Sequence, residues 1–331
     1  MEYNIVVVGA SGQVGCQVVK ELEERSFPVK KLLAFASKDS IAESVEFLGE
    51  EIAVQELDSS AFTGADIVFF CTPAQITTEY LQTATQAGAF CIDLSRASIG
   101  DSAVPCIVSE LSSTGLLKSL NRVANPPVAA IQAALILAPL QEKFGLKQAS
   151  LTVMQSASAL GNAGVEMLRK QSGALLNARP LDSAEVEANT PAQLAYNLVP
   201  VNAGGENYAG ADEIGDILRQ LLADTDVKLQ VELIQMPIFY ASALSLTCQL
   251  DAEVDEALVR RTLQEQQGLE LLTPVPLDTC GTNVAPEHDT IPVCLTQMGG
   301  DGRLNLWSVI DNLRKGSALN AVQIAELFIA R

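Results

Sequence analysis

The chain has 331 residues, which is too long for one average domain and suits two. Its net charge of −19 repels phosphate backbones, so we exclude nucleic acid as a partner. The longest apolar stretch, residues 126–139, is too short to span a bilayer and contains Gln132, so we expect no membrane partner.

The first 125 residues alternate between strand and helix patterns. Residues 3–9 form a largely apolar run, as expected of a buried parallel strand, and residues 12–25 have helical periodicity. Further strand-like runs, with helical stretches between them, lie at residues 31–37, 67–71 and 90–94. This alternation predicts an open, mostly parallel sheet with helices on both faces.

The second half of the chain is richer in strands and has fewer crossovers. Strands are predicted at residues 150–156, 228–238, 243–250, 291–298 and 304–310. Helices are predicted at residues 163–171, 212–223 and 255–265, and an amphipathic helix at residues 313–331. The pattern favours an α+β domain on a mixed or antiparallel sheet with long apolar strands.

Seven cysteines occur at irregular spacings without a C-x-x-C pair. Most lie in apolar runs, so we predict reduced, buried thiols in a cytoplasmic protein. Residues 1–4 lead directly into a strand, which predicts that there is no signal peptide. No spacing of Cys, His and carboxylate residues is typical of a metal site, so we predict no metal.

A glycine-rich turn follows the first strand and precedes the first helix, in the sequence G-A-S-G-Q-V-G. Gly9 permits a tight turn, Gly12 lets the backbone approach a pyrophosphate, and Gly15 lets the helix pack closely on the strand. The helix N-terminus then offers N–H groups to phosphate. The alternative is a sharp turn without a ligand. The dinucleotide-binding residues that we predict around this turn are Gly9, Ser11, Gly12, Gln13 and Val14.

The segment after the second strand, A-F-A-S-K-D-S, does not match one cofactor cleanly. Ser37 and Ser40 are suited to hold the 2′-phosphate of NADP, whereas Asp39 is a carboxylate that would repel it. The sequence therefore leaves NAD and NADP open, and it predicts weak binding of either one.

Three stretches resemble the aspartate-semialdehyde dehydrogenase family. Residues 124–132, A-N-P-P-V-A-A-I-Q, resemble its nucleophile loop A-N-P-N-C-S/T-T. Residues 154–164 contain Gln155 and resemble its substrate-orienting segment, and residues 305–326 are close to its C-terminal signature. The resemblance implies an α/β fold: a Rossmann-like dinucleotide-binding domain plus an α+β substrate and dimerisation domain. The implied bounds are 1–127 with the C-terminal helix 313–331 for the first domain, and 128–312 for the second.

The resemblance also implies a reaction and the side chains that it needs. In the family a Cys thiolate attacks the carbonyl group, a His transfers the proton and a nicotinamide exchanges hydride. The resulting thioester reacts with phosphate, and Arg side chains bind the anionic groups. It further implies a cofactor contact at Asn312.

At the matching positions this chain lacks those groups. Val128 stands at the position of the Cys, Ser242 at that of the His, and Gln235 at that of the Arg for the substrate carboxylate; the substrate-orienting Gln155 is kept. Ile99 and Gln220 replace two further cationic residues. We therefore predict no catalytic residue among these positions. In the cofactor loop after the fourth strand, Pro73 removes an N–H group, which supports the expectation of weak binding.

Other residues could have taken over the chemistry, but each has a simpler interpretation. His288, the only histidine, lies in a polar loop and is predicted to be solvated. Cys248 alternates with leucines, which favours core packing, and Glu110 is expected to be a structural anchor.

Two classes of function remain open. The first is a non-catalytic family member that resembles the Usg-type paralogues of these dehydrogenases, keeps the dimer and acts by association, as a homodimer or as a heterodimer with an active paralogue. The second is an NAD(P)-dependent oxidoreductase that acts on a different carbonyl substrate. Turnover of any carbonyl compound with a nicotinamide cofactor would favour the second.

Overall fold

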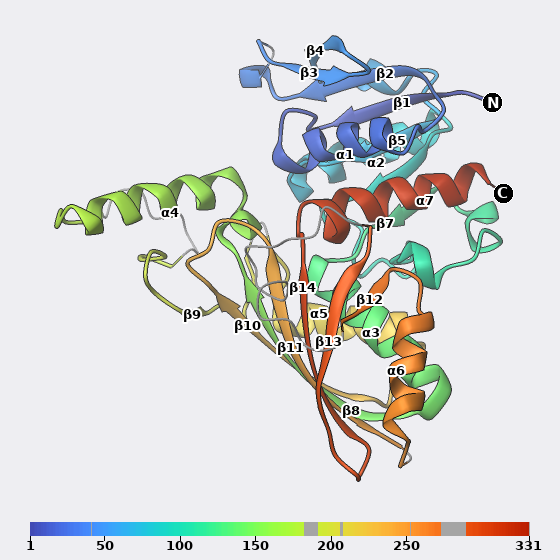
Figure 1. The fold of residues 1–331 in the computed structure, drawn as a ribbon. Coiled ribbons are helices and arrows are strands. Elements are labelled where there is room, and N and C mark those ends of the chain that lie inside the picture. The colour runs from blue at the N-terminus through green and yellow to red at the C-terminus, as the bar shows by residue number, and fades with distance from the viewer. Residues whose placement is uncertain (41, 182–190, 206–207, 252, 273–288, 331) are drawn as a thin grey trace. The chain divides into compact units, whose positions relative to one another are not determined.

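The computed structural model describes residues 1–40, 42–181, 191–205, 208–251, 253–272 and 289–330. It consists of two compact units, one formed by Met1–Pro126 with Gly316–Arg331 and the other by Pro127–Lys315 (Figure 1). Cys280 and His288 lie outside the described residues, so their predicted roles stay predictions. No helix among the described residues is long and apolar enough to cross a membrane.

The first unit is built on a seven-stranded sheet in the order β3-β4-β2-β1-β5-β6-β7. All neighbouring pairs are parallel except β3 with β4. The strands are β1 (Tyr3–Val8), β2 (Val29–Ala36), β3 (Ser44–Phe47), β4 (Glu50–Glu56), β5 (Ile67–Phe70), β6 (Phe90–Asp93) and β7 (Arg122–Ala124). The helices are α1 (Gln13–Glu24), α2 (Ala74–Gln86) and α7 (Asn320–Ile329), with short 3₁₀ segments η1 (Lys38–Ser40), η2 (Ser59–Phe62), η3 (Ser109–Leu111) and η4 (Leu116–Ser119).

Helices cover both faces of this sheet, because both sets of alternating side chains on β1 are apolar. Ile5 and Val7 pack into a core that includes residues of α1 and α7, such as Val18 and Phe328. Val6 and Val8 pack into the opposite core with residues of η2 and α2, including Phe62. The predicted parallel sheet with helices on both faces is confirmed for this unit.

Two parts of the first unit differ from the sequence prediction. A β3–β4 hairpin lies where a helical stretch was expected, and its two-residue turn places Leu48 and Gly49 at φ 53° and 78°. The C-terminal segment is a π-helical turn, Arg314–Leu319, followed by α7. The predicted amphipathic character is confirmed in α7: the buried residues Asn320, Ala321, Ile324, Ala325 and Phe328 share one face, and Gln323 and Glu326 on the other face are only partly buried.

The second unit contains a mixed seven-stranded sheet in the order β12-β13-β14-β11-β8-β10-β9. Its strands are β8 (Leu146–Gln155), β9 (Val199–Pro200), β10 (Lys228–Gln235), β11 (Ser242–Leu250), β12 (Leu269–Leu271), β13 (Ile291–Met298) and β14 (Arg303–Ile310). Its helices are α3 (Val128–Phe144), α4 (Gly161–Leu176), α5 (Ala211–Leu221) and α6 (Glu256–Glu265), and a 3₁₀ segment, η5 (Ala157–Leu160), precedes α4. The predicted mixed sheet is confirmed.

One face of this sheet is covered by helices and the other is mixed. Helices α3, α5 and α6 pack against the face that carries Leu151 of β8 and Leu246 of β11. The opposite face is polar in its middle, where it presents Thr152, Ser245 and Glu232. Near the start of β11 the same face is apolar, because Ala243 and Val309 are buried there and Met154 and Trp307 pack against them. This face therefore combines an apolar end with a polar middle.

The cysteines are less uniformly buried than expected. The six described cysteines are free thiols, and Cys91, Cys248 and Cys294 are buried as predicted. Cys16, however, is exposed on the first turn of α1, where its Sγ lies 3.2 Å from the carbonyl oxygen of Ala10. Its pKa is raised, chiefly by partial burial and then by the charge of Glu43.

Candidate functional site

The glycine turn of the first unit has the geometry that its sequence requires. Gly9 has φ 82°, and a Cβ atom there would collide with the carbonyl group of Cys71. A Cβ atom on Gly15 would lie 2.8 Å from the Cα of Ala10, so helix α1 lies directly against the turn. Gly12 caps α1 without a side-chain hydrogen bond to the first helical turn. The first N–H groups of α1, which follow this turn, therefore suit a phosphate group.

The other residues predicted to contact the dinucleotide lie at neighbouring strand ends. The N–H of Gly9 donates to the carbonyl oxygen of Phe35 at 2.7 Å, which joins the glycine turn to the end of β2. Ser37 and Ser40 follow β2, and the N–H of Ser40 donates to the Ser37 carbonyl at 3.0 Å. The side chain of Asp39 lies outside what the structure describes. Because β1 and β2 are parallel, their following loops meet at one edge of the sheet.

Two further loops reach the same edge. Pro73 follows β5 and stands immediately before the first residue of α2. After β6, the buried carboxylate of Asp93 accepts hydrogen bonds from Ser95 N at 2.7 Å and Ser98 N at 2.7 Å. This turn precedes Ile99 and holds Arg96 at φ 70°. An Asp two residues before a Ser is typical of such a turn.

In the second unit, three of the four site positions singled out by the resemblance, all except Val128, form a row on the covered face of the sheet. Gln155 ends β8 and is paired in register with Gln235, which ends the parallel strand β10. Ser242 begins β11, one residue before the pair Ala243–Met154. It is therefore next to Gln155, on the side opposite Gln235. All three side chains are more than 90% buried. We call Gln235, Gln155 and Ser242 the edge row.

Val128, the fourth position, starts the helix that lies over this row. Helix α3 runs into β8 through a turn at Gly145, so it is antiparallel to β8 and begins near the end of that strand. One helical turn after Val128, the Nε2 of Gln132 donates to Ser308 Oγ at 3.0 Å, and Ser308 is two residues from the end of β14. The structure thus brings Val128 to the same sheet edge as the row.

The loops around the edge row are tied together by a hydrogen-bond network that sequence reasoning missed. Ser156 Oγ lies 2.9 Å from Ser158 Oγ, and Asn312 Nδ2 donates to Ser158 Oγ at 2.9 Å. Asn312 Oδ1 accepts a hydrogen bond from Ala241 N at 2.9 Å. Both ends of the buried Asn312 amide are therefore bound within the protein, and its predicted contact with a cofactor stays a prediction. No spacing in the sequence links residues so far apart.

The edge row offers neutral amides and one hydroxyl group. Ser242 is 4% exposed, and the amide side chains beside it are poor bases. Burial raises the pKa of the Cys248 thiol to about 12, and this residue lies on the same strand, in the core. A protonated, buried thiol packs as an apolar group, as predicted. Glu110 accepts a hydrogen bond from Ser109 Oγ at 2.7 Å in the first unit, which agrees with its expected structural role.

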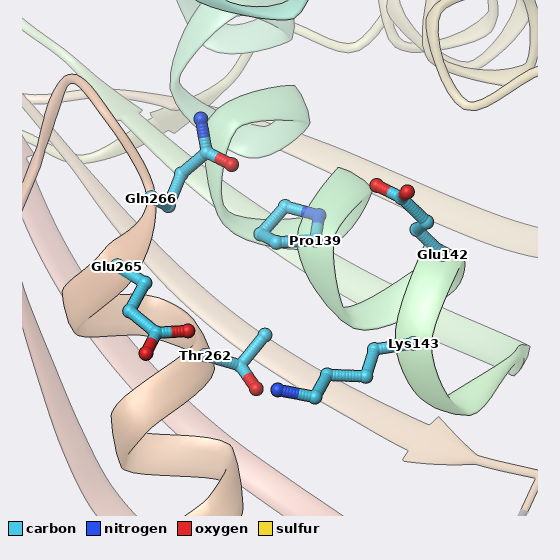
Figure 2. A pocket seen from close by; sticks show the side chains of 6 residues that line it. All are labelled: Pro139, Glu142, Lys143, Thr262, Glu265 and Gln266. Carbon is cyan, nitrogen blue, oxygen red and sulfur yellow. The ribbon is translucent and has the colours of Figure 1, made fainter.

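A separate surface pocket of about 400 Å³ lies between the C-terminal half of α3 and the end of α6. Figure 2 shows the Lys143 side chain reaching across it toward Thr262. The remaining lining residues are Pro139, Glu142, Glu265 and Gln266. The pocket is several helical turns from Val128, and its lining mixes both signs of charge. Among the residues that the structure describes, no group of three or more His, Cys, Asp or Glu side chains is arranged to hold a metal ion.

Comparisons with known proteins agree with this arrangement. The profile of the semialdehyde dehydrogenase NAD-binding domain matches residues 4–119, and that of the semialdehyde dehydrogenase dimerisation domain matches residues 137–315. A USG-1 protein homolog from Azotobacter vinelandii is 35% identical over 98% of this chain and 97% of its own length. An aspartate-semialdehyde dehydrogenase from Shewanella violacea is 31% identical over 99% of this chain and 98% of its own.

The similarity extends to three dimensions. The crystal structure of aspartate semialdehyde dehydrogenase II from Vibrio cholerae superposes with a TM-score of 0.91 at 27% identity, and it covers 100% of this chain and 99% of its own. The two domain profiles, the full-length relatives and this superposition together show that the chain belongs to the aspartate-semialdehyde dehydrogenase family.

Proposed function

We propose that this chain is a non-catalytic member of its family that keeps the two-unit fold, assembles as a homodimer and binds NAD or NADP weakly. The observation that carries the proposal is the neutral edge row, Gln235, Gln155 and Ser242, beneath Val128. Covalent acyl transfer needs a nucleophile with an adjacent base. Loss of an oriented base alone lowers the rate about 10²–10⁴-fold, and here the nucleophile is absent as well.

The glycine turn supports the nucleotide part of the proposal. Gly9 and Gly15 leave the room that a phosphate-binding turn needs, and residues 4–119 match an NAD-binding domain. Pro73 replaces an N–H donor in the loop beside that turn, which favours weak binding. When bound, the nicotinamide would supply hydride chemistry.

The second unit supports the proposed dimer. Its match to a dimerisation domain spans residues 137–315. Among its described residues it also exposes six large apolar side chains, which are costly to leave in water: Leu176, Tyr196, Leu198, Phe239, Tyr240 and Leu258. A second copy that buries roughly 2,000 Å² or more would remove this cost. Purification with an active paralogue instead of a second copy would show a heterodimer.

The test is an activity assay of the purified chain with aspartate semialdehyde, phosphate and either NAD or NADP. The Shewanella violacea relative, prepared in parallel, serves as the active control. We expect the control to turn over and this chain to give no rate above background. A rate within the usual enzyme range of about 1–10³ s⁻¹ would overturn the proposal.

The competing function is an oxidoreductase that acts on another carbonyl compound, and the intact glycine turn favours it. Such an enzyme would transfer hydride without a covalent thioester, so it would not need a thiol at position 128. A screen of aldehydes and ketones with NADH and NADPH distinguishes the two functions, because only the oxidoreductase would consume the cofactor.

A further inference from the structure

Two buried carbonyl oxygens in the edge row lack a hydrogen-bond partner among the described residues. They are the Oε1 atoms of Gln155 and Gln235, whose side chains are 8% and 0% exposed. A buried acceptor without a partner destabilises the fold, because it has lost its hydrogen bond to water. Because the two residues are register neighbours on parallel strands, their side chains leave the sheet side by side. One bound group could therefore satisfy both oxygens.

The hydrogen bonds of Nε2 fix the orientation of the Gln235 side-chain amide. Its Nε2 donates to the carbonyl oxygen of Gln155 at 3.1 Å and lies 3.5 Å from that of Met236. Exchanging the two ends of the amide would place Oε1 against these carbonyl oxygens, where lone pairs repel one another. The Oε1 atom of Gln235 therefore remains an acceptor that points away from the backbone.

The donors in the neighbouring loops are engaged elsewhere. Ser158 Oγ and Asn312 Nδ2 bind one another at 2.9 Å, and Ser156 Oγ contacts Ser158 Oγ at 2.9 Å. The N–H of Ala241 is used by Asn312 Oδ1. These donors are engaged in a network of their own, which fixes the loops at the ends of β8, β11 and β14.

We propose that the edge row binds a small molecule through an N–H donor group, either a primary amide or an ammonium group, and disfavours a carboxylate. An amide NH₂ carries two donors and an ammonium group three, so either can meet both Oε1 atoms. A carboxylate would place its own acceptor oxygens against them without a cation, and burying such a charge is unfavourable. The inference rests on the proposed function in that this edge is taken to be free of the family's reaction.

The experiment is calorimetric titration of the full-length protein with three four-carbon compounds that differ only in their end groups. These are succinamide, 1,4-diaminobutane and succinate. We expect succinamide, diaminobutane or both to bind at least tenfold more tightly than succinate. Binding by only one of the first two identifies amide or ammonium as the donor. Equal or tighter binding of succinate, or no binding by any of the three because water alone occupies the edge, overturns the proposal.

Variants connect the binding to the row. Gln235→Leu removes the acceptor at similar size and should weaken the preferred compound at least tenfold. If Gln235→Leu does not fold, Gln155→Leu takes its place as the test variant. It keeps the Nε2 contact of Gln235 and should weaken binding of the preferred compound by the same amount. Gln235→Glu keeps an acceptor and should retain or strengthen diaminobutane binding, whereas Gln235→Arg should reverse the order in favour of succinate. Unchanged affinity in a folded leucine variant contradicts the proposal. Since no turnover is measured, these results are independent of the activity assay.

Discussion

Replacing Gly15 by Ala tests whether the close contact between α1 and the glycine turn is required. In an open helix position, Ala is favoured over Gly by about 1 kcal/mol. At position 15, however, the new Cβ atom would lie 2.8 Å from Ala10 Cα and collide with the Gly9 carbonyl. These are backbone atoms that cannot rotate away, so we take the upper end of the usual overpacking cost, about 3 kcal/mol.

The net destabilisation is then about 2 kcal/mol, and it should lower the Tm of the first unit by roughly 4–8 °C. The matched control is Gly173→Ala, because Gly173 lies within α4 and no atom comes within 4 Å of its Cβ position. We expect this variant to be equally stable or slightly more stable. Calorimetry and NAD titration of both variants provide the check. A Gly15→Ala protein with unchanged Tm and cofactor affinity would refute the packing argument.

Four further outcomes are expected. Titration calorimetry should show weak binding with little preference between NAD and NADP, and tight NADP-selective binding would mean that Pro73 matters less than argued. Val128→Cys alone should restore no dehydrogenase activity, since the thiol would lack a base; an assay showing product would contradict this. Ser245 lies in the middle of the open sheet face, so Ser245→Arg should yield monomers in sedimentation if a second copy covers that face. The control Ser102→Arg, in an exposed loop of the first unit, should remain dimeric. A dimeric Ser245→Arg protein would place the interface elsewhere. Because burial raises the pKa of Cys248 to about 12, its thiol stabilises the fold fully below the unfolded-state pKa of about 8.5, and this contribution is lost as pH rises toward 12. The urea concentration at the unfolding midpoint should therefore fall as the pH is raised above 9, and it should fall less in Cys248→Ala. A midpoint that does not change with pH would argue against the raised pKa of Cys248.

Local patterns were enough to predict most of the secondary structure. The apolar strand before Gly9 and the close contact at Gly15 involve residues that are near one another in the chain, so the local sequence is enough to predict the glycine turn. The β3–β4 hairpin also had a local signal, since Val45, Phe47 and Ile52 are apolar at alternating positions around a turn with Gly49. The helix predicted there was an error of interpretation.

The candidate site depended on information that no local pattern carries. Resemblance to the family singled out Gln155, Gln235 and Ser242, but only strand register shows that they are neighbours. The engagement of Asn312 by Ser158 joins residues 154 positions apart, and the unpartnered oxygens of the glutamines depend on side-chain orientation. Tertiary packing decides both features.

The second unit can keep its fold while its edge row changes, because α3 is anchored elsewhere. Ile136 and Leu137 are fully buried, and burial of such side chains contributes about 1.5–3 kcal/mol each, whereas Val128 is only half-buried at the helix start. Substitutions at the edge therefore leave the core intact, which makes the variants above informative. The same geometry explains why single restorations should fail. A thiol at position 128, an imidazole at 242 and a guanidinium at 235 would act as one unit around a single substrate, and residues that act as a unit contribute non-additively. Activity should therefore appear only when all three are present, and a stepwise gain from each substitution would contradict this non-additive account.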